Sequence, residues 1–213
     1  MSHSFHAETF FDLSRVTFAD LFAGTENVWD AIRKLDDYIA AQFETGKIKS
    51  NYGKDGNIFI GEGTVIEDQV QIIGPAIIGK NCLVRHAAYF RAGCLIGDNV
   101  LIGHGTEIKH SVILNGAAAP HLNVLSDSIL GNDANFSGGA ITANFRLDKR
   151  PVRVKHNDSH NETGLLKFGA IIGDGSNVGV NVVTNPGTLL GKNTIVHPQK
   201  LVTGYHSADS VIK

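Results

Sequence analysis

The stretch that begins Ile60-Gly-Glu-Gly-Thr-Val-Ile66 and runs to Leu114 carries a large apolar residue at every sixth position. A small or β-branched residue stands four positions after each of the first nine, from Thr64 to Val112. An α-helix repeats every 3.6 residues or so and a strand about every two, so neither explains this period. The ten large residues are Ile60, Ile66, Ile72, Ile78, Val84, Phe90, Ile96, Ile102, Ile108 and Leu114.

A period of six is typical of a triangular coil in which each turn has three short strands and about eighteen residues. Gly61, Gly79 and Gly97 are eighteen residues apart and should stack along one corner. The pattern is interrupted near Pro120, resumes at Leu130 and Phe136, and returns between Ile172 and Val202. We therefore predict an all-β fold, a hexapeptide-repeat parallel β-helix over residues 53–207 with the ten large residues pointing inward. Known proteins with this repeat coil left-handed, so we expect a left-handed β-helix.

Residues 1–52 lack the six-residue period, and residues 208–213 form a short tail. Val28, Ile32, Leu35, Ile39 and Phe43 recur at helical spacing, which predicts one amphipathic helix that ends at Gly46. We expect this N-terminal helical segment to cap or flank the prism. A structural cap over the open first coil is favoured over a binding role, because a solenoid end must be covered.

A second stretch without the period, at about 145–168, is expected to leave the prism as an extruded loop. It carries six Lys and Arg residues against three Asp and Glu residues. This excess of positive charge suggests contact with an anionic ligand, although a solvated loop explains the charge equally well.

Composition excludes several classes of partner. The formal net charge is −2, so no overall positive field attracts nucleic acid or anionic lipid. No apolar run approaches the roughly 20 residues that a membrane helix needs. The first residues show neither the basic nor the apolar region of a secretion signal. We expect a cytoplasmic protein with no nucleic-acid or membrane partner.

Histidines are the candidate general bases near neutral pH. His86 and His104, eighteen apart, should stack on one outer face, with His110 one corner along. Such an array could bind a metal, but surface histidines seldom do, and we predict no metal. His121 differs because Ala117-Ala-Ala-Pro-His-Leu-Asn-Val124 departs from the pattern. We expect this coil to bulge outward and to carry function.

Four stretches together carry a resemblance to a known family. They are Phe90-Arg-Ala-Gly, Thr106-Glu-Ile-Lys-His-Ser, Pro120-His-Leu-Asn, and Gly131-Asn-Asp-Ala-Asn-Phe-Ser-Gly-Gly-Ala-Ile-Thr-Ala-Asn. Residues 55–207 resemble the C-terminal acetyltransferase half of bacterial N-acetylglucosamine-1-phosphate uridyltransferase and the acetyltransferase domains of related sugar-1-phosphate nucleotidyltransferases. The resemblance implies a homotrimer that binds acetyl-CoA between neighbouring prisms and acetylates an amino-sugar 1-phosphate.

The resemblance also implies roles for individual residues. His121 matches the general base, and we expect Asn144 or a backbone carbonyl to fix its tautomer. Arg91 and Lys109 match the cations that hold the sugar phosphate. We expect them to lack a carboxylate partner, the alternative being that Glu107 or another acid neutralises them. Asn135 and Asn144 match asparagines that contact the sugar and orient the reacting groups. Val124 stands where the family commonly has an aromatic hydroxyl, and Arg146 could replace a lost sugar contact.

Several functions remain open. The leading prediction is an acetyl-CoA-dependent N-acetyltransferase for a glucosamine-1-phosphate-like amino sugar or a nucleotide-linked amino sugar. The alternative is a non-catalytic assembly module that binds sugar phosphate or nucleotide sugar, which Val124 favours. A metal-dependent hydratase of the γ-carbonic anhydrase type is less favoured, because His86, His104 and His110 do not match its spacing. Residues 1–52 are too short for a nucleotide-binding domain, so any nucleotidyltransferase would be a separate partner.

Overall fold

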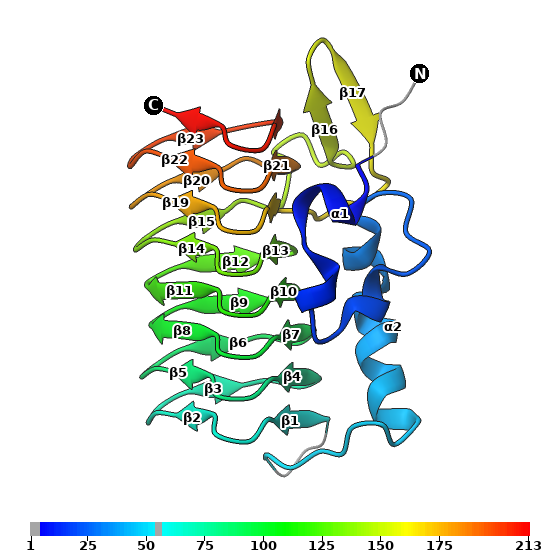
Figure 1. Cartoon of the computed structure of the whole chain (residues 1–213), viewed down its shortest axis with the longest axis vertical. Helices are drawn as coiled ribbons and strands as arrows, with labels where there is room; N and C mark the ends of the chain where they lie inside the picture. The colour runs from blue at the N-terminus through cyan, green and yellow to red at the C-terminus, as the bar shows by residue number, and fades with distance from the viewer. Residues whose placement is uncertain (1–4, 54–56) are drawn as a thin grey trace.

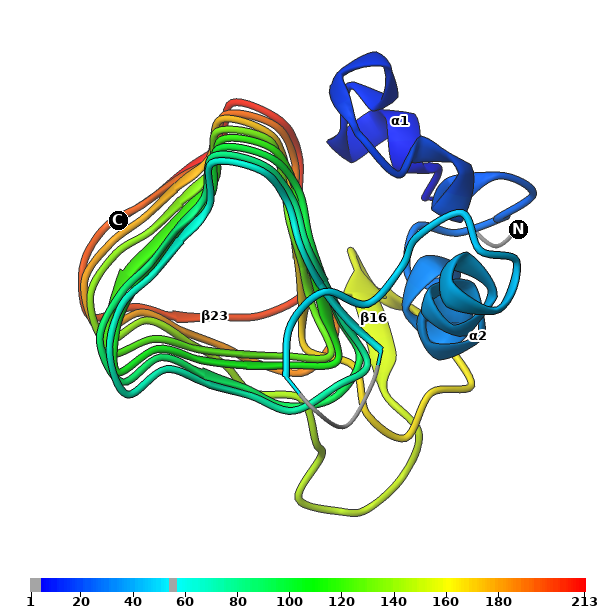
Figure 2. The same cartoon turned by 90° about the horizontal axis from the view of Figure 1, so that it is seen from below.

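A computed structural model describes residues 5–53 and 57–213. The chain begins with short helices, α1 (Ala7–Phe10), η1 (Leu13–Arg15) and η2 (Ala19–Phe22), and a longer one, α2 (Asp30–Glu44). It then winds into a parallel β-solenoid whose three sheets form the sides of a triangular prism (Figure 1, Figure 2). The predicted fold class is confirmed, and the left hand of the coil stays a prediction.

Three parallel sheets, named A, B and C here, follow one another around each turn. Sheet A contains β1 (Ile58–Ile60), β4 (Ala76–Ile78), β7 (Cys94–Ile96), β10 (Ser111–Ile113), β13 (Ile129–Leu130), β18 (Ala170–Ile172), β21 (Thr188–Leu190) and β24 (Tyr205–His206). Sheet B contains β2 (Val65–Ile66), β5 (Leu83–Val84), β8 (Leu101–His104), β11 (Ala118–His121), β14 (Asn135–Phe136), β19 (Asn177–Val178), β22 (Ile195–Val196) and β25 (Val211–Ile212). Sheet C contains β3 (Gln71–Ile72), β6 (Tyr89–Phe90), β9 (Glu107–Lys109), β12 (Val124–Ser126), β15 (Ile141–Thr142), β20 (Val183–Thr184) and β23 (Leu201–Val202). The corners between them are called A–B, B–C and C–A.

The prism interior is the apolar core that the six-residue period predicts. Residues from Ile78 to Ile108 in the predicted series are fully buried, and Ile60, Ile66 and Ile72 pack against them. The predicted glycine stack is also present at the A–B corner. A Cβ on Gly79 would lie 2.5 Å from the carbonyl carbon of Gly97, so only glycine allows successive coils this close.

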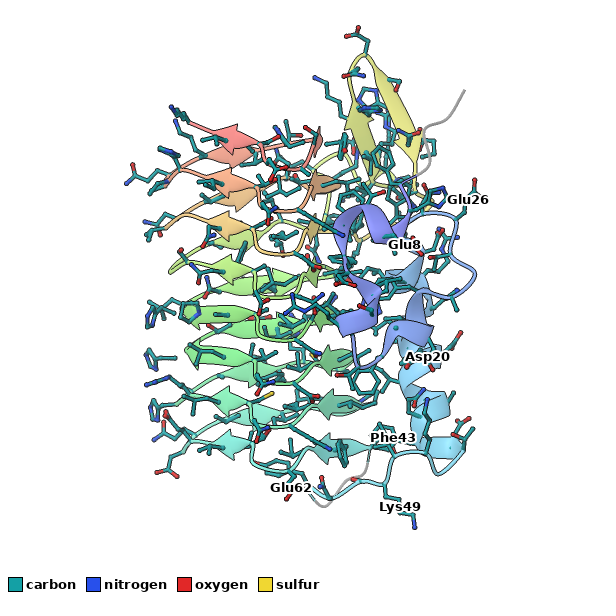
Figure 3. All side chains as sticks on the ribbon, viewed as in Figure 1. Glu8, Asp20, Glu26, Phe43, Lys49 and Glu62 are labelled. Atoms are coloured by element: carbon teal, nitrogen blue, oxygen red, sulfur yellow. The ribbon has the colours of Figure 1, made fainter. Side chains whose placement is uncertain are left out.

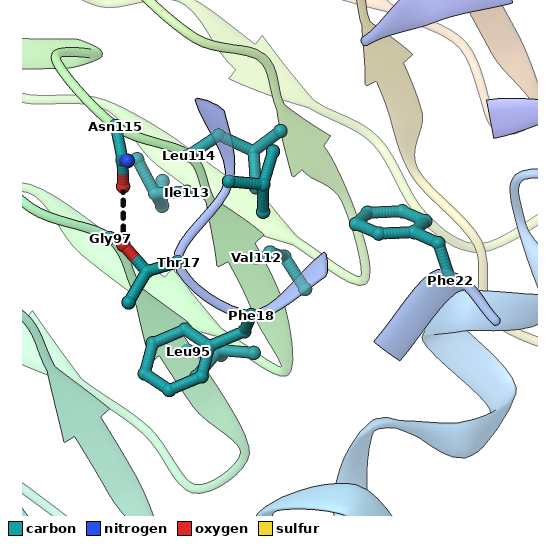
Figure 4. A pocket seen from close by; sticks show the side chains of 10 residues that line it. Thr17, Phe18, Phe22, Leu95, Gly97, Val112, Ile113, Leu114 and Asn115 are labelled. Atoms are coloured by element: carbon teal, nitrogen blue, oxygen red, sulfur yellow. Dashed lines mark hydrogen bonds between the residues drawn. The ribbon is translucent and has the colours of Figure 1, made fainter. Parts of the chain in front are cut away.

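The prediction that Leu114 points inward is wrong. Ile113, not Leu114, aligns with Ile96 in sheet A and lies in the core. Leu114 instead faces outward into the apolar contact with the N-terminal segment, near Phe18 and Phe22 (Figure 4). The cause is a C–A corner one residue shorter than in the preceding coil, between Ile108 and Ile113.

The expected bulge at Pro120 is also absent. Ala119 takes the large inward position, in register with Ile102, and His121 aligns with His104. The side chain of Asn123 takes the small inward position, where its amide donates to the carbonyl of Ser137 at 2.6 Å. The coil closes normally because an alanine and a hydrogen-bonded asparagine fill the space of the usual apolar pair.

The N-terminal segment flanks the prism, and the preferred placement over the first coil is wrong (Figure 1, Figure 2). It packs against the outer face of sheet A, whose outward residues Ile77, Leu95, Ile129 and Leu189 are buried by the contact. Helix α2 contributes an apolar face, and exposed Glu8, Asp20 and Glu26 lie on the outside of the segment (Figure 3). The flank covers a second apolar surface that the six-residue period alone does not reveal.

The extruded loop folds back onto the same flank. It contains an antiparallel hairpin, β16 (Arg153–His156) and β17 (Ser159–Glu162). Val152, Val154 and Phe168 are fully buried, and the ring of Phe168 lies 6.2 Å from that of Trp29. The loop is therefore anchored against the N-terminal segment. Within the described residues, no helix combines the length and the apolar composition needed to cross a bilayer.

Candidate functional site

Three histidines form a column along the B–C corner. The rings of His86 and His104 stack with centroids 5.6 Å apart, as the spacing predicts. His121 continues the column because it aligns with His104 in neighbouring strands. All three are exposed. The sequence reasoning missed this continuation, since the shortened C–A corner makes the interval from His104 to His121 seventeen residues.

His121 presents its side chain to the outside of the prism. Its backbone N–H donates to Oδ1 of Asn123 at 3.1 Å, which ties the exposed histidine to the buried asparagine. Among the described residues no ion pair reaches the imidazole of His121. The imidazole of His121 is therefore accessible from outside the prism.

The C–A corner holds a second polar column. In two successive coils the interval between large inward residues shrinks from six to five, at Ile108–Ile113 and Leu125–Leu130. Each short turn has a non-glycine residue in the left-handed region, His110 with φ 43° and Asp127 with φ 49°. These turns stack His110 and Asp127 on adjacent coils, beside Lys109 and Asn144.

The carboxylate of Asp127 is the centre of this column. Its side chain is only 5% exposed and accepts hydrogen bonds from Nζ of Lys109 at 3.1 Å and Nδ1 of His110 at 2.9 Å. Nδ2 of Asn144 also donates to it. Burial acts to raise the pKa of Asp127, but the hydrogen bonds from His110 and Asn144 and the charge of Lys109 outweigh it, so the pKa lies below its usual value. The sequence reasoning did not identify Asp127.

The expectation that Arg91 and Lys109 lack a carboxylate partner is wrong. Arg91 is exposed and lies on the coil below Lys109. Its Nη1 lies 3.1 Å from Oε1 of Glu107. Lys109 pairs with the buried carboxylate of Asp127. Each cation is therefore already paired with a carboxylate. An anionic ligand would have to share or displace these ion pairs. The exposed Arg91–Glu107 pair is the easier one to displace, because exposed ion pairs contribute little.

The predicted contact between Asn144 and His121 is absent. The amide of Asn144 donates to Asp127 at the C–A corner, whereas His121 stands at the B–C corner. A strand of sheet C, β12 in this coil, separates the two corners. At about 3.3 Å per residue the separation is on the order of 15 Å, which exceeds the reach of a monosaccharide bound to one chain.

The remaining candidates are spread over sheet B, sheet C and the loop. Asn135 begins β14 and donates from its amide to Oγ of Ser137 at 3.1 Å, on the sheet that also carries His121. Arg146 pairs with Asp148 in the loop and lines an open cavity that includes Phe145 and Pro186. Val124 begins β12 and is half-buried. The structure therefore joins Lys109 and Asn144 through Asp127, places Arg91 one coil below Lys109, and leaves His121, Asn135 and Arg146 elsewhere.

Within the described part of one chain, His86, His104 and His110 do not meet at one point. His86 and His104 stand at the B–C corner, and His110 stands at the C–A corner bonded to Asp127. Over residues 5–53 and 57–213, no three histidine, cysteine or acidic side chains converge as a metal centre would require.

Searches against known proteins give related sequences, although no family model matches the chain. Bifunctional protein GlmU of Methanococcus vannielii is 35% identical over 158 residues, which are 74% of this chain and 38% of GlmU. The bifunctional sugar-1-phosphate nucleotidylyltransferase/acetyltransferase of Sulfurisphaera tokodaii is 32% identical over 79% of this chain and 42% of its own length. This chain thus spans about two fifths of these relatives. The uncharacterized acetyltransferase YaiX of Escherichia coli K12 is 37% identical over 70% of this chain and 71% of its own length.

A triangular β-solenoid with polar columns at two corners defines the chain as a hexapeptide-repeat protein. The identity with YaiX extends over more than two thirds of both chains. The chain belongs to the hexapeptide-repeat acetyltransferase family, and its solenoid is similar to the C-terminal region of GlmU.

Proposed function

We propose that the protein transfers the acetyl group of acetyl-CoA to the amine of an amino-sugar 1-phosphate or a nucleotide-linked amino sugar. The observation that carries this proposal is the exposed imidazole of His121, which forms no ion pair within the described residues, on a solenoid related to acetyltransferases. An amine must be neutral to attack a thioester, so a base beside it accelerates the reaction.

The chemical step needs one base and a donor to the oxyanion. The substrate ammonium loses one proton to solvent, and His121 removes a second proton from the nitrogen as it attacks the thioester carbonyl. A tetrahedral intermediate forms and collapses as the carbon–sulfur bond breaks. CoA leaves as a thiolate and takes the proton from His121, which returns the imidazole to its starting state.

The proposed site is shared between two copies of the chain in a homotrimer. The B–C corner offers the base, and the C–A corner offers Arg91, Lys109 and Asn144 for the sugar phosphate. Because these corners lie too far apart in one chain, the His121 corner of one copy must meet the C–A corner of its neighbour. The N-terminal flank covers sheet A, so sheets B and C are left for this contact. A threefold ring closes such a heterologous contact.

A second candidate is a non-catalytic module that binds sugar phosphate or nucleotide sugar. Val124 favours it, since an apolar residue stands where the family commonly has an aromatic hydroxyl. The acids beside Arg91 and Lys109 also weaken the attraction for phosphate. Such a module would bind the sugar but release no thiol from acetyl-CoA.

The test is a thiol-release assay with acetyl-CoA against a panel of amino-sugar 1-phosphates, nucleotide amino sugars and free amino sugars. The proposal predicts turnover on at least one phosphorylated amino sugar. His121→Ala should lower kcat by about 10²–10⁴-fold. His104→Ala, which removes the neighbouring histidine of the same column, should stay near the wild-type rate. Sugar binding without turnover would favour the module, and an unchanged rate in His121→Ala would refute the assignment of the base.

A further inference from the structure

We propose that Asp127 is the positioning residue of the C–A corner, which fixes Lys109 and Asn144 and turns the carbonyl oxygen of Asn144 toward the bound sugar. This inference rests on the proposed function, because it assigns a task to residues placed there. Asp127 would not touch the substrate.

The direction of the Asn144 amide follows from the chemistry of its partner. An ionised carboxylate has only acceptor oxygens, so the group of Asn144 that faces Asp127 must be Nδ2. The low pKa of Asp127 keeps it ionised near neutral pH. Oδ1 of Asn144 is thereby directed away from Asp127 and accepts no hydrogen bond from any residue in the described part of the chain. The oxygen can accept from a hydroxyl or an amine of a sugar.

Asp127 is itself held from several sides. Its backbone N–H donates to the carbonyl of Lys109 at 2.9 Å, and its carbonyl accepts from Gly169 at 2.8 Å. The His110 ring donates to it and also lies 3.6 Å from Asp36 of helix α2. Gly93 leaves room for this pair, because a Cβ there would lie 2.8 Å from Asp36 and 2.9 Å from the His110 ring. A buried carboxylate so constrained is a rigid point of attachment.

Lys109 is fixed by the same carboxylate. Its Nζ lies 3.1 Å and 3.3 Å from the two carboxylate oxygens, and its side chain is 20% exposed. Without Asp127 the long side chain would sample many rotamers and lose its place beside Asn144. The Asp127 carboxylate thus fixes both the ammonium of Lys109 and the acceptor oxygen of Asn144. A cation binds the phosphate of an amino-sugar phosphate, and an acceptor binds its hydroxyl or amine.

The experiment compares Asp127→Gly with Asp133→Gly. Both aspartates stand in left-handed corners, with φ 49° and 54°, where glycine is tolerated, and both accept from a cationic side chain. Asp133 pairs with Arg15 of the N-terminal segment, far from the C–A corner along the coil. Asp127→Gly should lower kcat/KM for the amino sugar by about tenfold to a hundredfold, with a higher KM for the sugar and an unchanged KM for acetyl-CoA. Asp133→Gly should leave all three within twofold of wild type.

Asp127→Asn is the conservative variant. The amide of Asp127→Asn keeps an acceptor oxygen for Lys109 and Asn144 but loses the negative charge. The KM for the sugar should therefore rise at least threefold, but by less than in Asp127→Gly. If Asp127→Gly does not fold, this variant decides the question. An unchanged KM for the sugar in Asp127→Asn, or a kcat/KM within twofold of wild type in Asp127→Gly, would overturn the proposal.

A crystal structure of each folded Asp127 variant separates this inference from the proposed function. The inference predicts that Lys109 and Asn144 change rotamer or partner in Asp127→Gly, while the backbone of the coil stays in place. Unmoved side chains would overturn it, whatever the activity. If the wild type acetylates no sugar of the panel, the proposed function fails, and the positions of these two side chains still decide the role of Asp127.

Discussion

Replacing Ile96 by aspartate should prevent folding at neutral pH. Ile96 is fully buried at the centre of the prism, where it aligns with Ile78 below and Ile113 above. The surrounding core cluster is apolar and offers no cation to a carboxylate. An aspartate at this position must therefore be protonated to stay inside.

The expected loss follows from two contributions. Protonating a carboxyl with an ordinary pKa near 3.9 at pH 7 costs about 4 kcal/mol, at about 1.4 kcal/mol per pH unit. Losing the buried apolar side chain costs a further 2–5 kcal/mol or so. The total of about 6–9 kcal/mol approaches the whole stability of a typical domain, about 5–15 kcal/mol.

Urea denaturation followed by circular dichroism measures this loss, with two control variants. Ile96→Val should cost only about 0.5–1.5 kcal/mol. Val65→Asp, at a position that is 54% exposed, should stay close to wild type. Because the folded-state pKa of the new aspartate is raised, its destabilisation should shrink as the pH falls toward its unfolded pKa near 4. A folded Ile96→Asp variant with the wild-type urea midpoint at pH 7 would refute the inward register of sheet A.

Three further predictions concern the flank, the buried acid and the assembly. Phe168→Ala should lower the free energy of unfolding by about 3–5 kcal/mol in urea denaturation, because the ring is fully buried against Trp29, and an unchanged midpoint would contradict the anchored loop. Since the pKa of Asp127 is lowered on folding, its ionised form stabilises the protein above pH 4 or so, and this contribution disappears as the pH falls through the folded-state pKa. The stability difference between wild type and Asp127→Asn should therefore narrow in acid, and a difference independent of pH would argue against the ionised acid. Light scattering should give about three times the chain mass of 22.8 kDa, and a monomer mass would contradict the shared site.

The sequence predicts the interior of the prism well because its period is strict. Each inward residue from Ile60 to Ile108 follows from counting by six, since every strand turns one large side chain toward the axis. The count of six gives the wrong residue at Leu114 because the C–A corner before it is one residue shorter. A shift of one residue along a strand moves the side chain to the opposite face of the sheet.

The sequence also contains a pattern that indicates the covered outer face of sheet A, but counting every sixth residue does not reveal it. Phe59, Ile77 and Leu95 recur every eighteen residues, as do Ile171 and Leu189, just before the inward residue. In sheets B and C the same outward position holds polar residues in some coils, such as Gln71, Glu107 and Asn135, whereas in sheet A it is never polar in this way, which indicates a partner for sheet A. The helical spacing in residues 28–43 supplies this partner, so the side placement could have been inferred.

The candidate site was predicted only in part. Resemblance singled out Arg91, Lys109 and Asn144, which the structure places on different coils of the same corner, with Lys109 and Asn144 joined through Asp127. It gave no reason to consider Asp127, whose importance depends on burial and on three donors from the two neighbouring coils. The two shortened intervals, Ile108–Ile113 and Leu125–Leu130, mark that corner in the sequence, and they could have directed attention to it.

The central claim, a site shared between neighbouring copies, is tested most directly by mixing two inactive variants. His121→Ala keeps an intact C–A corner, and Lys109→Ala keeps an intact His121 corner. Co-assembled at equal amounts into mixed trimers, they should restore about one quarter of the wild-type thiol-release activity, since a quarter of the junctions then unite two intact corners. No activity above that of the separate variants would place both groups in one chain and contradict the account.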